Sequence, residues 1–403
     1  MLTLDQIYQA AYVLKDAARK TDLIYAPEFT DEFRPGREIY LKSENLQLTG
    51  SFKLRGAYYK ISQLSDEQKA AGIIACSAGN HAQGVAIAAT RMGIKSIICM
   101  PDGAPISKIE NTKHLGAEVR LASGTYDDAY DMALKIQQET GATFIHPFDD
   151  DLVIAGQGTI GLEILDQLKD VDAVLCPIGG GGLISGVAYA IKSLNPSVKV
   201  YGVQAANAPS MYESIKQGKS VTVDSVATFA DGIAVKTPGE TTFELVSKYV
   251  DDIVTVTEDQ IATAILHLLE RQKLIAEGAG AVSIAAAMFS DLPLEGKKTV
   301  CIVSGGNIDV NILSRVITRG LMTSGRNTML QIALEDKPGQ LVGVSQVISK
   351  CGGNVIAVHH ERSDANMPIS SCILRVGMET RDFEQIEEIR TELKKAGFHI
   401  VDD

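Results

Sequence analysis

Short apolar runs alternate with amphipathic or alanine-rich stretches over residues 1–322. Seven of the runs have the length and composition of buried strands: Glu38–Lys42, Gly72–Cys76, Ser96–Met100, Glu118–Ala122, Ala173–Ile178, Val198–Gln204 and Thr299–Ser304. The stretches between them predict helices, including Ala82–Met92, Asp127–Thr140, Leu183–Leu194 and Asp259–Leu274, the last after a capping-box pattern at Thr257–Gln260. Buried strands separated by helices are typical of right-handed β-α-β units around parallel sheets. Seven strands exceed one ordinary sheet, so we expect an α/β fold of two lobes with a cleft between them.

The pattern changes near the polar segment Thr323–Asn327. Beyond it the chain predicts a strand, a helix, two strands, a helix and a strand: Met329–Leu334, Pro338–Lys350, Val355–Glu361, Ser371–Val376, Asp382–Ala396 and Phe398–Val401. This βαββαβ order is the ferredoxin-like arrangement. We therefore expect a separate C-terminal module over residues 326–403.

Composition and charge exclude several classes of protein. Of the 403 residues, 45% are hydrophobic and 22% are charged, which is typical of a folded chain. The net charge of −12 and the lack of tryptophan and of any basic–aromatic cluster argue against a nucleic-acid partner. The longest apolar runs are too short or too polar to cross a membrane, and the N-terminus lacks a secretory pattern. Six isolated cysteines without a CxxC pair indicate buried thiols in a reducing, cytoplasmic setting: Cys76, Cys99, Cys176, Cys301, Cys351 and Cys372.

Some familiar motifs are better explained by structure than by chemistry. Gly156–Gly161 matches GxGxxG, but the next strand, Ala173–Ile178, has no acidic residue at its end to hold a ribose. Helix entry and close packing explain these glycines better. His359 and His360 are adjacent on a predicted strand and so face opposite sides, which argues against shared ligation. The histidines otherwise form no ligand cluster, and we expect no metal site.

Four consecutive glycines form the most informative loop. Gly179, Gly180, Gly181 and Gly182 follow the apolar strand Ala173–Ile178, and a helix is predicted from Leu183. Without Cβ atoms, the backbone N–H groups of such a turn can converge on an anion beside the positive end of the helix dipole. No lysine follows, so a monophosphate fits better than a polyphosphate.

Lys53 lies in the first turn of a predicted helix, within Thr49–Ala57. A cation is unfavourable at a helix N-terminus, and apolar neighbours lower the pKa of an amine. Both effects favour the neutral amine, which attacks an aldehyde to form a Schiff base. A lysine alone would more often be an ordinary surface residue, but this one accompanies a loop that binds a monophosphate. A cofactor with one aldehyde and one phosphate is pyridoxal 5'-phosphate.

Two further turns follow predicted strands. Ser77-Ala78-Gly79-Asn80-His81 begins a helix and offers amides and small donors, and Ser304-Gly305-Gly306-Asn307 offers a hydroxyl. Each could be only a strand–helix connection. Because ligands of open α/β sheets bind at the carboxyl ends of strands, several such turns in one chain favour a shared site.

These segments together resemble the fold type II, or tryptophan-synthase-β-type, pyridoxal-phosphate enzymes, and among them the threonine dehydratases. The resemblance rests on Lys42–Gln47 and Ser51–Gly56, followed in the family's order by the three turns described above. It implies a catalytic domain over residues 1–322, with a smaller lobe at about residues 43–147 inserted in the larger one. The C-terminal module resembles an ACT domain, a small-ligand regulatory module, at Asp336–Leu341 and Gly352–Val355.

The resemblance also implies roles for individual residues. Lys53 would bind the cofactor as a Schiff base and then remove the substrate's Cα proton. The other cofactor contacts would come from Phe52 on the ring, Asn80 at the ring hydroxyl, Gly179, Gly180, Gly181, Gly182 and Leu183 at the phosphate, Gly232 beside the cofactor and Ser304 at the ring nitrogen. The substrate carboxylate would be surrounded by Ser77, Asn80 and His81. In the ACT domain, Gly339, Leu341 and Asn354 would serve effector binding.

The implied reaction is the dehydration and deamination of L-threonine to 2-oxobutanoate and ammonia, with L-serine as a secondary substrate. An amino-acid effector such as isoleucine or valine, a role in isoleucine biosynthesis, and a homodimer or homotetramer are implied in the same way. A serine dehydratase or racemase on the same scaffold is the nearest alternative, and a non-catalytic amino-acid sensor is an alternative of another class. Ala78 stands where the family's racemases carry a serine base, and Gln204 and Ser210 stand where metal-dependent relatives carry acids.

Overall fold

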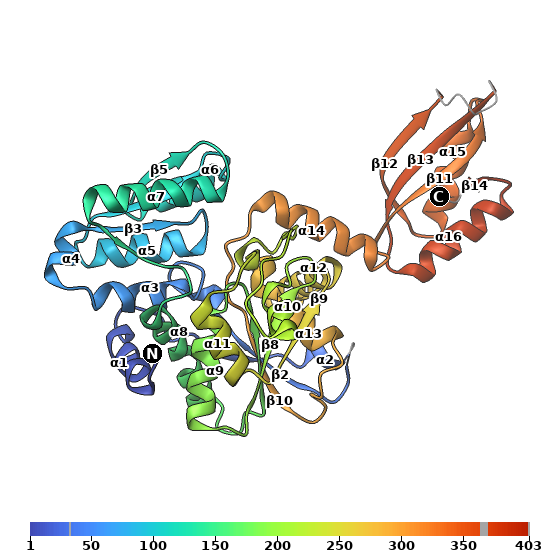
Figure 1. The fold of residues 1–403 in the computed structure, drawn as a ribbon. Coiled ribbons are helices and arrows are strands. Elements are labelled where there is room, and N and C mark those ends of the chain that lie inside the picture. The colour runs from blue at the N-terminus through green and yellow to red at the C-terminus, as the bar shows by residue number, and fades with distance from the viewer. Residues whose placement is uncertain (32–33, 363–369, 402–403) are drawn as a thin grey trace. The chain divides into compact units, whose positions relative to one another are not determined.

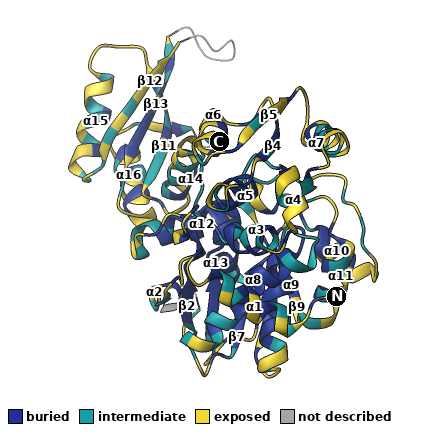
Figure 2. Ribbon diagram, turned by 90° about the vertical axis from the view of Figure 1, so that its left-hand side faces the viewer, coloured by how far each residue is buried: buried dark blue, intermediate teal, exposed yellow. Residues whose placement is uncertain are grey.

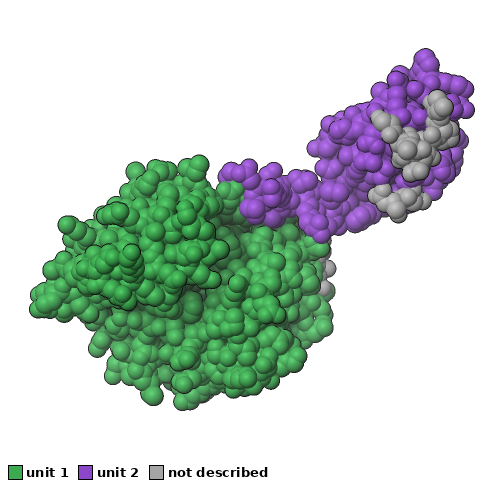
Figure 3. Space-filling view, turned by 45° about the horizontal axis from the view of Figure 1, so that its top comes forward, with its two compact units in different colours: residues 1–309 green, residues 310–403 purple. Residues whose placement is uncertain are grey.

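The computed structural model describes residues 1–31, 34–362 and 370–401. The chain forms two compact units, residues 1–309 and residues 310–403 (Figure 3). In the described part of the chain, none of the helices combines the length and the apolar character that a membrane span requires.

The first unit contains a six-stranded sheet in the order β1-β2-β10-β7-β8-β9. Its strands are β1 (Leu23–Tyr25), β2 (Glu38–Lys42), β7 (Ala173–Pro177), β8 (Lys199–Ala205), β9 (Asp252–Val256) and β10 (Lys298–Ile302). All neighbours pair in parallel except β1 with β2. Every residue of β7 is buried, which is typical of a central strand covered on both faces.

Three long helices bury this sheet: α8 (Asp151–Gln167), α9 (Gly182–Leu194) and α13 (Gly278–Phe289). Figure 2 shows them largely as buried segments around β7. Val174 and Cys176 of β7 pack in one apolar cluster with α8 and α9, whereas α13 packs along β7 to β10. Other helices of the unit are α1 (Leu4–Leu14), α2 (Glu28–Asp31), α3 (Lys53–Ser62), α4 (Asp66–Ala71), α10 (Ser210–Gln217) and α11 (Glu240–Tyr249), with short 3-10 turns η1 (Glu44–Leu46) and η2 (Asp231–Ile233).

A second, four-stranded parallel sheet has the order β5-β4-β3-β6. It consists of β3 (Ile73–Cys76), β4 (Ser96–Pro101), β5 (Glu118–Ala122) and β6 (Thr143–Phe144), with helices α5 (Asn80–Arg91), α6 (Ile106–His114) and α7 (Tyr126–Thr140) (Figure 1). Ile73 and Ala75 of β3 face the cluster with α5, whereas Ile74 and Cys76 face the cluster with α7. These four strands lie in the chain between β2 and β7 of the larger sheet. The expected two-lobed α/β fold is therefore confirmed.

One predicted helix differs in detail. Residues 259–274 were expected to form one helix, but α12 (Glu258–His267) passes into a π-helical turn at Leu268–Gln272, and Lys273 ends it with a left-handed φ of 58°. The start is as predicted, because Thr257 and Gln260 form both hydrogen bonds of the capping box.

The second unit contains the expected βαββαβ order. After α14 (Val310–Thr323), the elements are β11 (Asn327–Glu335), α15 (Gln340–Lys350), β12 (Asn354–Glu361), β13 (Ser371–Glu379), α16 (Phe383–Lys395) and β14 (His399–Val401). The antiparallel sheet has the order β12-β13-β11-β14, which is the ferredoxin-like topology. The compact unit begins at Val310, because it also includes helix α14, which packs against β11.

Candidate active site

The predicted active-site residue Lys53 begins helix α3. The two residues directly before it are hydrogen-bonded to the turn that follows β10. Ser51 forms an isolated β-bridge with Gly305, and the N–H of Phe52 donates to the Ser304 carbonyl at 3.1 Å. Gly50 has a φ of +72°, and a Cβ there would lie 2.6 Å from Oδ1 of Asn307. The Ser51–Gly56 segment is thus positioned by the Ser304–Asn307 turn, as the shared-site hypothesis requires.

The amine of Lys53 is held in a low-polarity environment. Its Nζ donates to the Pro147 carbonyl at 2.8 Å and lies 5.4 Å from the centre of the Phe52 ring. Burial lowers the pKa of Lys53 to about 8, and the charge of Glu277 partly opposes this shift. A sizeable fraction of the amine is therefore neutral near pH 8, which is the form that reacts with an aldehyde.

The glycine loop joins β7 to α9 and has no room for side chains. A Cβ on Gly180 would lie 2.5 Å from the Phe148 ring, and one on Gly182 would lie 2.8 Å from the Phe148 carbonyl oxygen. Gly181 has a φ of +98°, and a Cβ there would meet Thr242. The Thr242 hydroxyl donates to the Gly180 carbonyl at 2.6 Å and fixes the loop.

This loop fits a phosphate group. Helix α9 starts at Gly182, so the first N–H groups of the helix have no acceptor one turn earlier in the chain. They point, with the positive end of the helix dipole, toward the loop. Pyridoxal phosphate carries an aldehyde and a phosphate. The amine of Lys53, with its lowered pKa, suits the aldehyde, and the glycine loop, which is lined by backbone alone, suits the phosphate.

Glu277 is a site residue that the sequence patterns did not reveal. Its Oε1 accepts a hydrogen bond of 2.6 Å from Nδ2 of Asn80, and Nδ2 of Asn307 donates to Oδ1 of Asn80 at 2.7 Å. A Cβ on Gly305 would lie 2.4 Å from Oε1 of Glu277, and one on Gly232 would lie 3.2 Å from it. The structure therefore brings together Asn80, Gly232 and the Ser304–Asn307 turn around one carboxyl group.

The carboxyl of Glu277 is difficult to ionise. Burial is the largest cause, and the charge of Asp231 acts in the same direction. The hydrogen bond from Asn80 and the charges of Lys108 and Lys53 oppose them, and the net effect raises the pKa of Glu277 to about 7. Because Glu277 and Lys53 influence each other's pKa, proton binding at one depends on the charge of the other.

The other predicted residues occupy three different settings. The Ser304 hydroxyl donates to the Ala279 carbonyl at 3.2 Å, just beyond β10. The Ser77 hydroxyl accepts from the N–H of Gly79 at 3.1 Å in the turn before α5. Nε2 of His81 lies 2.8 Å from the Ile145 carbonyl, and burial, with the charge of Lys53, lowers the pKa of His81 to about 3. The neutral imidazole donates to that carbonyl, so the side chain ties α5 to the segment after β6 rather than transferring protons.

The GxGxxG glycines are packing positions. Gly156, Gly158 and Gly161 lie inside α8 rather than at its start, so the helix-entry interpretation is wrong. A Cβ on Gly156 would lie 2.6 Å from the Arg55 carbonyl oxygen, and one on Gly158 would lie 3.0 Å from the Gly186 carbonyl oxygen. These glycines allow α8 to approach α3 and α9 closely, which confirms the close-packing interpretation.

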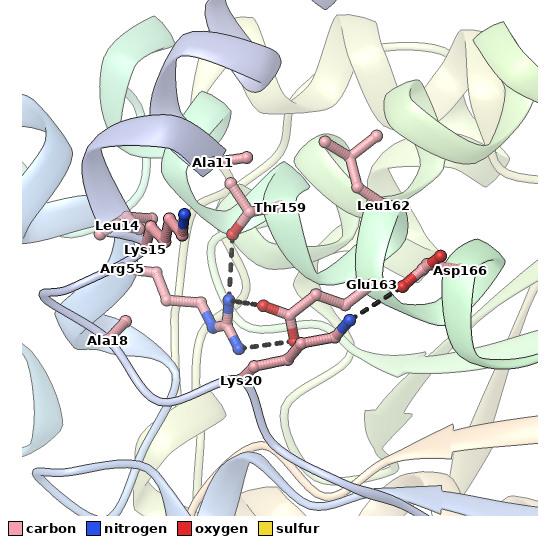
Figure 4. Close-up of a pocket in the computed structure, with 10 residues that line it drawn as sticks. All are labelled: Ala11, Leu14, Lys15, Ala18, Lys20, Arg55, Thr159, Leu162, Glu163 and Asp166. Atoms are coloured by element: carbon pink, nitrogen blue, oxygen red, sulfur yellow. Dashed lines mark hydrogen bonds and ion pairs between the residues drawn. The ribbon is translucent and has the colours of Figure 1, made fainter.

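The charged residues of the motif segments Lys42–Gln47 and Ser51–Gly56 form ion pairs with one another and with helix α8. Arg55 bonds to Glu44 at 2.8 Å and to Glu163 of α8 at 2.6 Å, and Lys42 contacts Glu163 at 2.6 Å. A cavity of about 280 Å³ beside α1 is lined by Arg55, Thr159 and Glu163, with Lys20 and Asp166 at its edge (Figure 4). Lys42, Glu44 and Arg55 are buried, so these motif residues hold β2, η1, α3 and α8 together.

The predicted regulatory residues do not form one group within a single chain. Gly339, with a φ of +93°, caps α15 at the end of the sheet where β11 finishes, and Leu341 follows it. Asn354 pairs with Glu379, which in turn pairs with Asn327 at the start of β11. Asn354 therefore lies at the opposite end of the sheet.

Comparison with known proteins agrees with this geometry. A family model described as "Pyridoxal-phosphate dependent enzyme" matches residues 14–305. The L-threonine ammonia-lyase of Thermotoga maritima is 51% identical over 400 residues, which are 99% of this chain and 99% of that protein. The processed form of threonine deaminase isoform 2 from Solanum lycopersicum has a TM-score of 0.74 and 41% identity, over 78% of this chain and 93% of that one. Maize serine racemase has a TM-score of 0.75 and 34% identity, over 80% of this chain and 98% of that one. The chain therefore belongs to the family of fold type II pyridoxal-phosphate-dependent enzymes.

Proposed function

We propose that this enzyme eliminates water from L-threonine and releases 2-oxobutanoate and ammonia, with L-serine as a secondary substrate. The observation that carries the proposal is the amine of Lys53, with its lowered pKa, at the helix start that is fastened to the Ser304–Asn307 turn. The full-length likeness to an L-threonine ammonia-lyase supports the same substrate.

When bound, pyridoxal phosphate supplies an electron sink for the bonds at the substrate's Cα. The Gly179–Gly182 loop and the first turn of α9 would hold its phosphate through backbone N–H groups. Phe52 would pack on the ring, and the Ser304 hydroxyl, a neutral partner, would face the ring nitrogen. Asn80, held by Glu277 and Asn307, would be fixed to bind the ring hydroxyl.

Other residues of the chain would bind the substrate and transfer its protons. Helix α5 begins at Asn80, so the N–H groups of its first turn are available for the substrate carboxylate, together with the Ser77 hydroxyl. Lys53 would accept the proton from Cα, and over the complete elimination this proton and the β-hydroxyl would leave together as one water molecule. General base help of this kind contributes about 10²–10⁴-fold to the rate. The released enamine then hydrolyses to the 2-oxo acid and ammonia.

The experiment that tests this function is an assay for 2-oxobutanoate with L-threonine, in parallel with L-serine. Lys53→Ala should lose the visible absorbance of the lysine-bound cofactor and at least about 10³-fold in turnover. Lys60→Ala, at an ion-paired position of the same helix, is the matched control and should retain both. Normal turnover in Lys53→Ala would refute the assignment.

Serine racemisation is the second candidate, because of the fold shared with maize serine racemase. Racemisation needs a base on each face of Cα, and Ala78 has no hydroxyl to serve as the second one. Solvent deuterium in recovered D-serine would support the racemase. Ala78→Ser is the informative variant, since it should introduce racemisation if the missing hydroxyl is decisive.

We infer that the second unit is an ACT-type regulatory module in a homodimer or homotetramer. The family match ends at residue 305, before this unit begins at Val310. The Gly339 turn of the second unit would bind an amino-acid effector such as isoleucine or valine. Such an effector would fit a role in isoleucine biosynthesis, and we infer that the enzyme acts in the cytoplasm. The six free cysteines, five of them buried, support a reducing location.

Deletion of residues 326–403 tests the regulatory role. The shortened enzyme should retain turnover of L-threonine and lose any response to isoleucine or valine. A response that survives the deletion would show that the effector binds elsewhere.

A further inference from the structure

The second unit brings together three side chains that no sequence motif links to one another. Asp336, His360 and Cys372 come from three separate segments, and their potential ligand atoms all lie within 4.8 Å of one another. Among the residues that the structure describes, this is the one group of three or more His, Cys, Asp or Glu side chains close enough to share an ion.

The pairing of the strands explains the convergence. His360 of β12 is opposite Leu374 of β13, and Cys372 lies two positions along β13 on the same face. Cys372 is opposite Leu334 of β11, and Asp336 follows Leu334 by two positions. The N–H of Asp336 donates to the Ser370 carbonyl at 2.9 Å, which holds the turn against the start of β13.

The same register separates two near neighbours in sequence from the group. His359 is opposite the exposed Arg375, so it faces the other side of the sheet. Cys351 lies after α15, away from the strand ends that carry the group. Each therefore provides a matched control for the corresponding ligand.

We propose that Asp336, His360 and Cys372 form a binding site for a divalent transition-metal ion, with Zn²⁺ as the best fit. Thiolate, imidazole and carboxylate are the three ligand types that zinc accepts, whereas Mg²⁺ and Ca²⁺ prefer oxygen alone. Three protein ligands leave a fourth tetrahedral position for water.

The local geometry can accommodate this ion. With bonds of about 2.0–2.3 Å, a tetrahedral ion spaces its ligand atoms about 3.5 Å apart. The ligand atoms of the group lie within 4.8 Å of one another, so no pair must approach by more than about 1.3 Å. Asp336 and His360 are exposed and can rotate, whereas the buried Cys372 is fixed in the core. Asp336 also pairs with Arg362 at 3.0 Å, and this ion pair must share the carboxylate or open when the metal binds.

The test uses the full chain with its cofactor, stripped of metal by a chelator and titrated with Co²⁺. Four-coordinate cobalt bound to a thiolate should give a charge-transfer band and visible d–d bands in the difference spectrum, at one ion per chain, and Zn²⁺ should abolish them. Cys372→Ser should remove the charge-transfer band. Because loss of a supporting partner already costs about 10–100-fold in affinity, His360→Gln should weaken Co²⁺ binding at least tenfold.

His359→Gln and Cys351→Ser should bind Co²⁺ like the parent. His360 is exposed, so His360→Gln tests the site even if replacement of the buried Cys372 impairs folding. The proposal is overturned if no thiolate band forms, if the band survives in Cys372→Ser, or if the control variants lose binding to the same extent. Since the three ligands lie outside residues 14–305, turnover of L-threonine by His360→Gln should equal that of the parent.

Discussion

Asn80 donates a hydrogen bond of 2.6 Å to the buried carboxyl of Glu277, a residue 197 positions later in the chain. The contact joins the first turn of α5 in the smaller lobe to the start of α13 in the larger one. Since Asn307 holds the other end of the Asn80 amide, the side chain is fixed from both directions.

This carboxyl should make stability depend on pH. Its pKa is raised from 4.5 to about 7, so the penalty for ionising it in the folded protein is absent below pH 4.5 and complete above pH 7. Glu277→Gln keeps an oxygen for Asn80 and removes that penalty. In urea unfolding, the variant should gain up to about 3 kcal/mol relative to the parent between pH 5 and pH 8. Glu110→Gln, at an exposed position, should show no such gain, and an equal gain in both would contradict the assignment.

Attachment of the cofactor should follow the protonation of Lys53. Only the neutral amine reacts, so the rate at which cofactor-free protein binds pyridoxal phosphate should rise about tenfold per pH unit and level off above about pH 8. Stopped-flow absorbance of the lysine-bound cofactor measures this rate. Glu277 raises the pKa of Lys53, so Glu277→Gln should move the profile to lower pH. A profile that still rises at pH 10 would show that the amine is not buried as described.

A single methyl group in the glycine loop should impair cofactor binding. In Gly180→Ala the new Cβ would meet the Phe148 ring at 2.5 Å, so the loop must move. We expect the dissociation constant for pyridoxal phosphate to rise at least tenfold, about 1.4 kcal/mol, in equilibrium titrations. Gly103→Ala, with open space around the new Cβ, should bind the cofactor like the parent. Unchanged affinity for pyridoxal phosphate in Gly180→Ala would show that the glycine loop does not bind the phosphate.

The paired charges behind Lys53 should contribute chiefly to stability. Glu163→Gln would deprive both Lys42 and Arg55 of a partner in a buried setting, at a cost of about 3 kcal/mol in the free energy of unfolding. Asp166→Asn, one turn away on α8, removes exposed ion pairs with Lys20 and Lys169 and should cost less than about 1 kcal/mol. Chemical unfolding of the two variants compares them directly, and equal costs would show that the buried pairing is not essential.

Local patterns in the sequence predict those parts of the candidate site that depend on adjacent residues. The glycine loop, Lys53 and the turn at Ser304 each combine a strand or helix end with small residues, so their chemistry is visible in a few positions. Glu277 has no such signal, because its role comes from contact with Asn80, Gly232 and Gly305 in three distant segments. The sequence shows only that an acidic residue directly precedes an Ala/Gly-rich segment.

The alignment of neighbouring strands was the other feature that the sequence could not predict. The sequence indicates that His359 and His360 face opposite sides, but not that His360 meets Asp336 and Cys372, because this depends on how β12 and β11 align with β13. The same alignment places Asn354 at the opposite end of the sheet from Gly339.

The bridge between Ser51 and Gly305 has a consequence for biosynthesis. The lysine is translated early, but the segment that fixes its helix is among the last parts of the first unit to leave the ribosome. The start of helix α3 can therefore take up its final position only after nearly the whole of residues 1–309 has been made. We expect loading of the cofactor to be a late event, coupled to completion of the first unit rather than to synthesis of Lys53 itself.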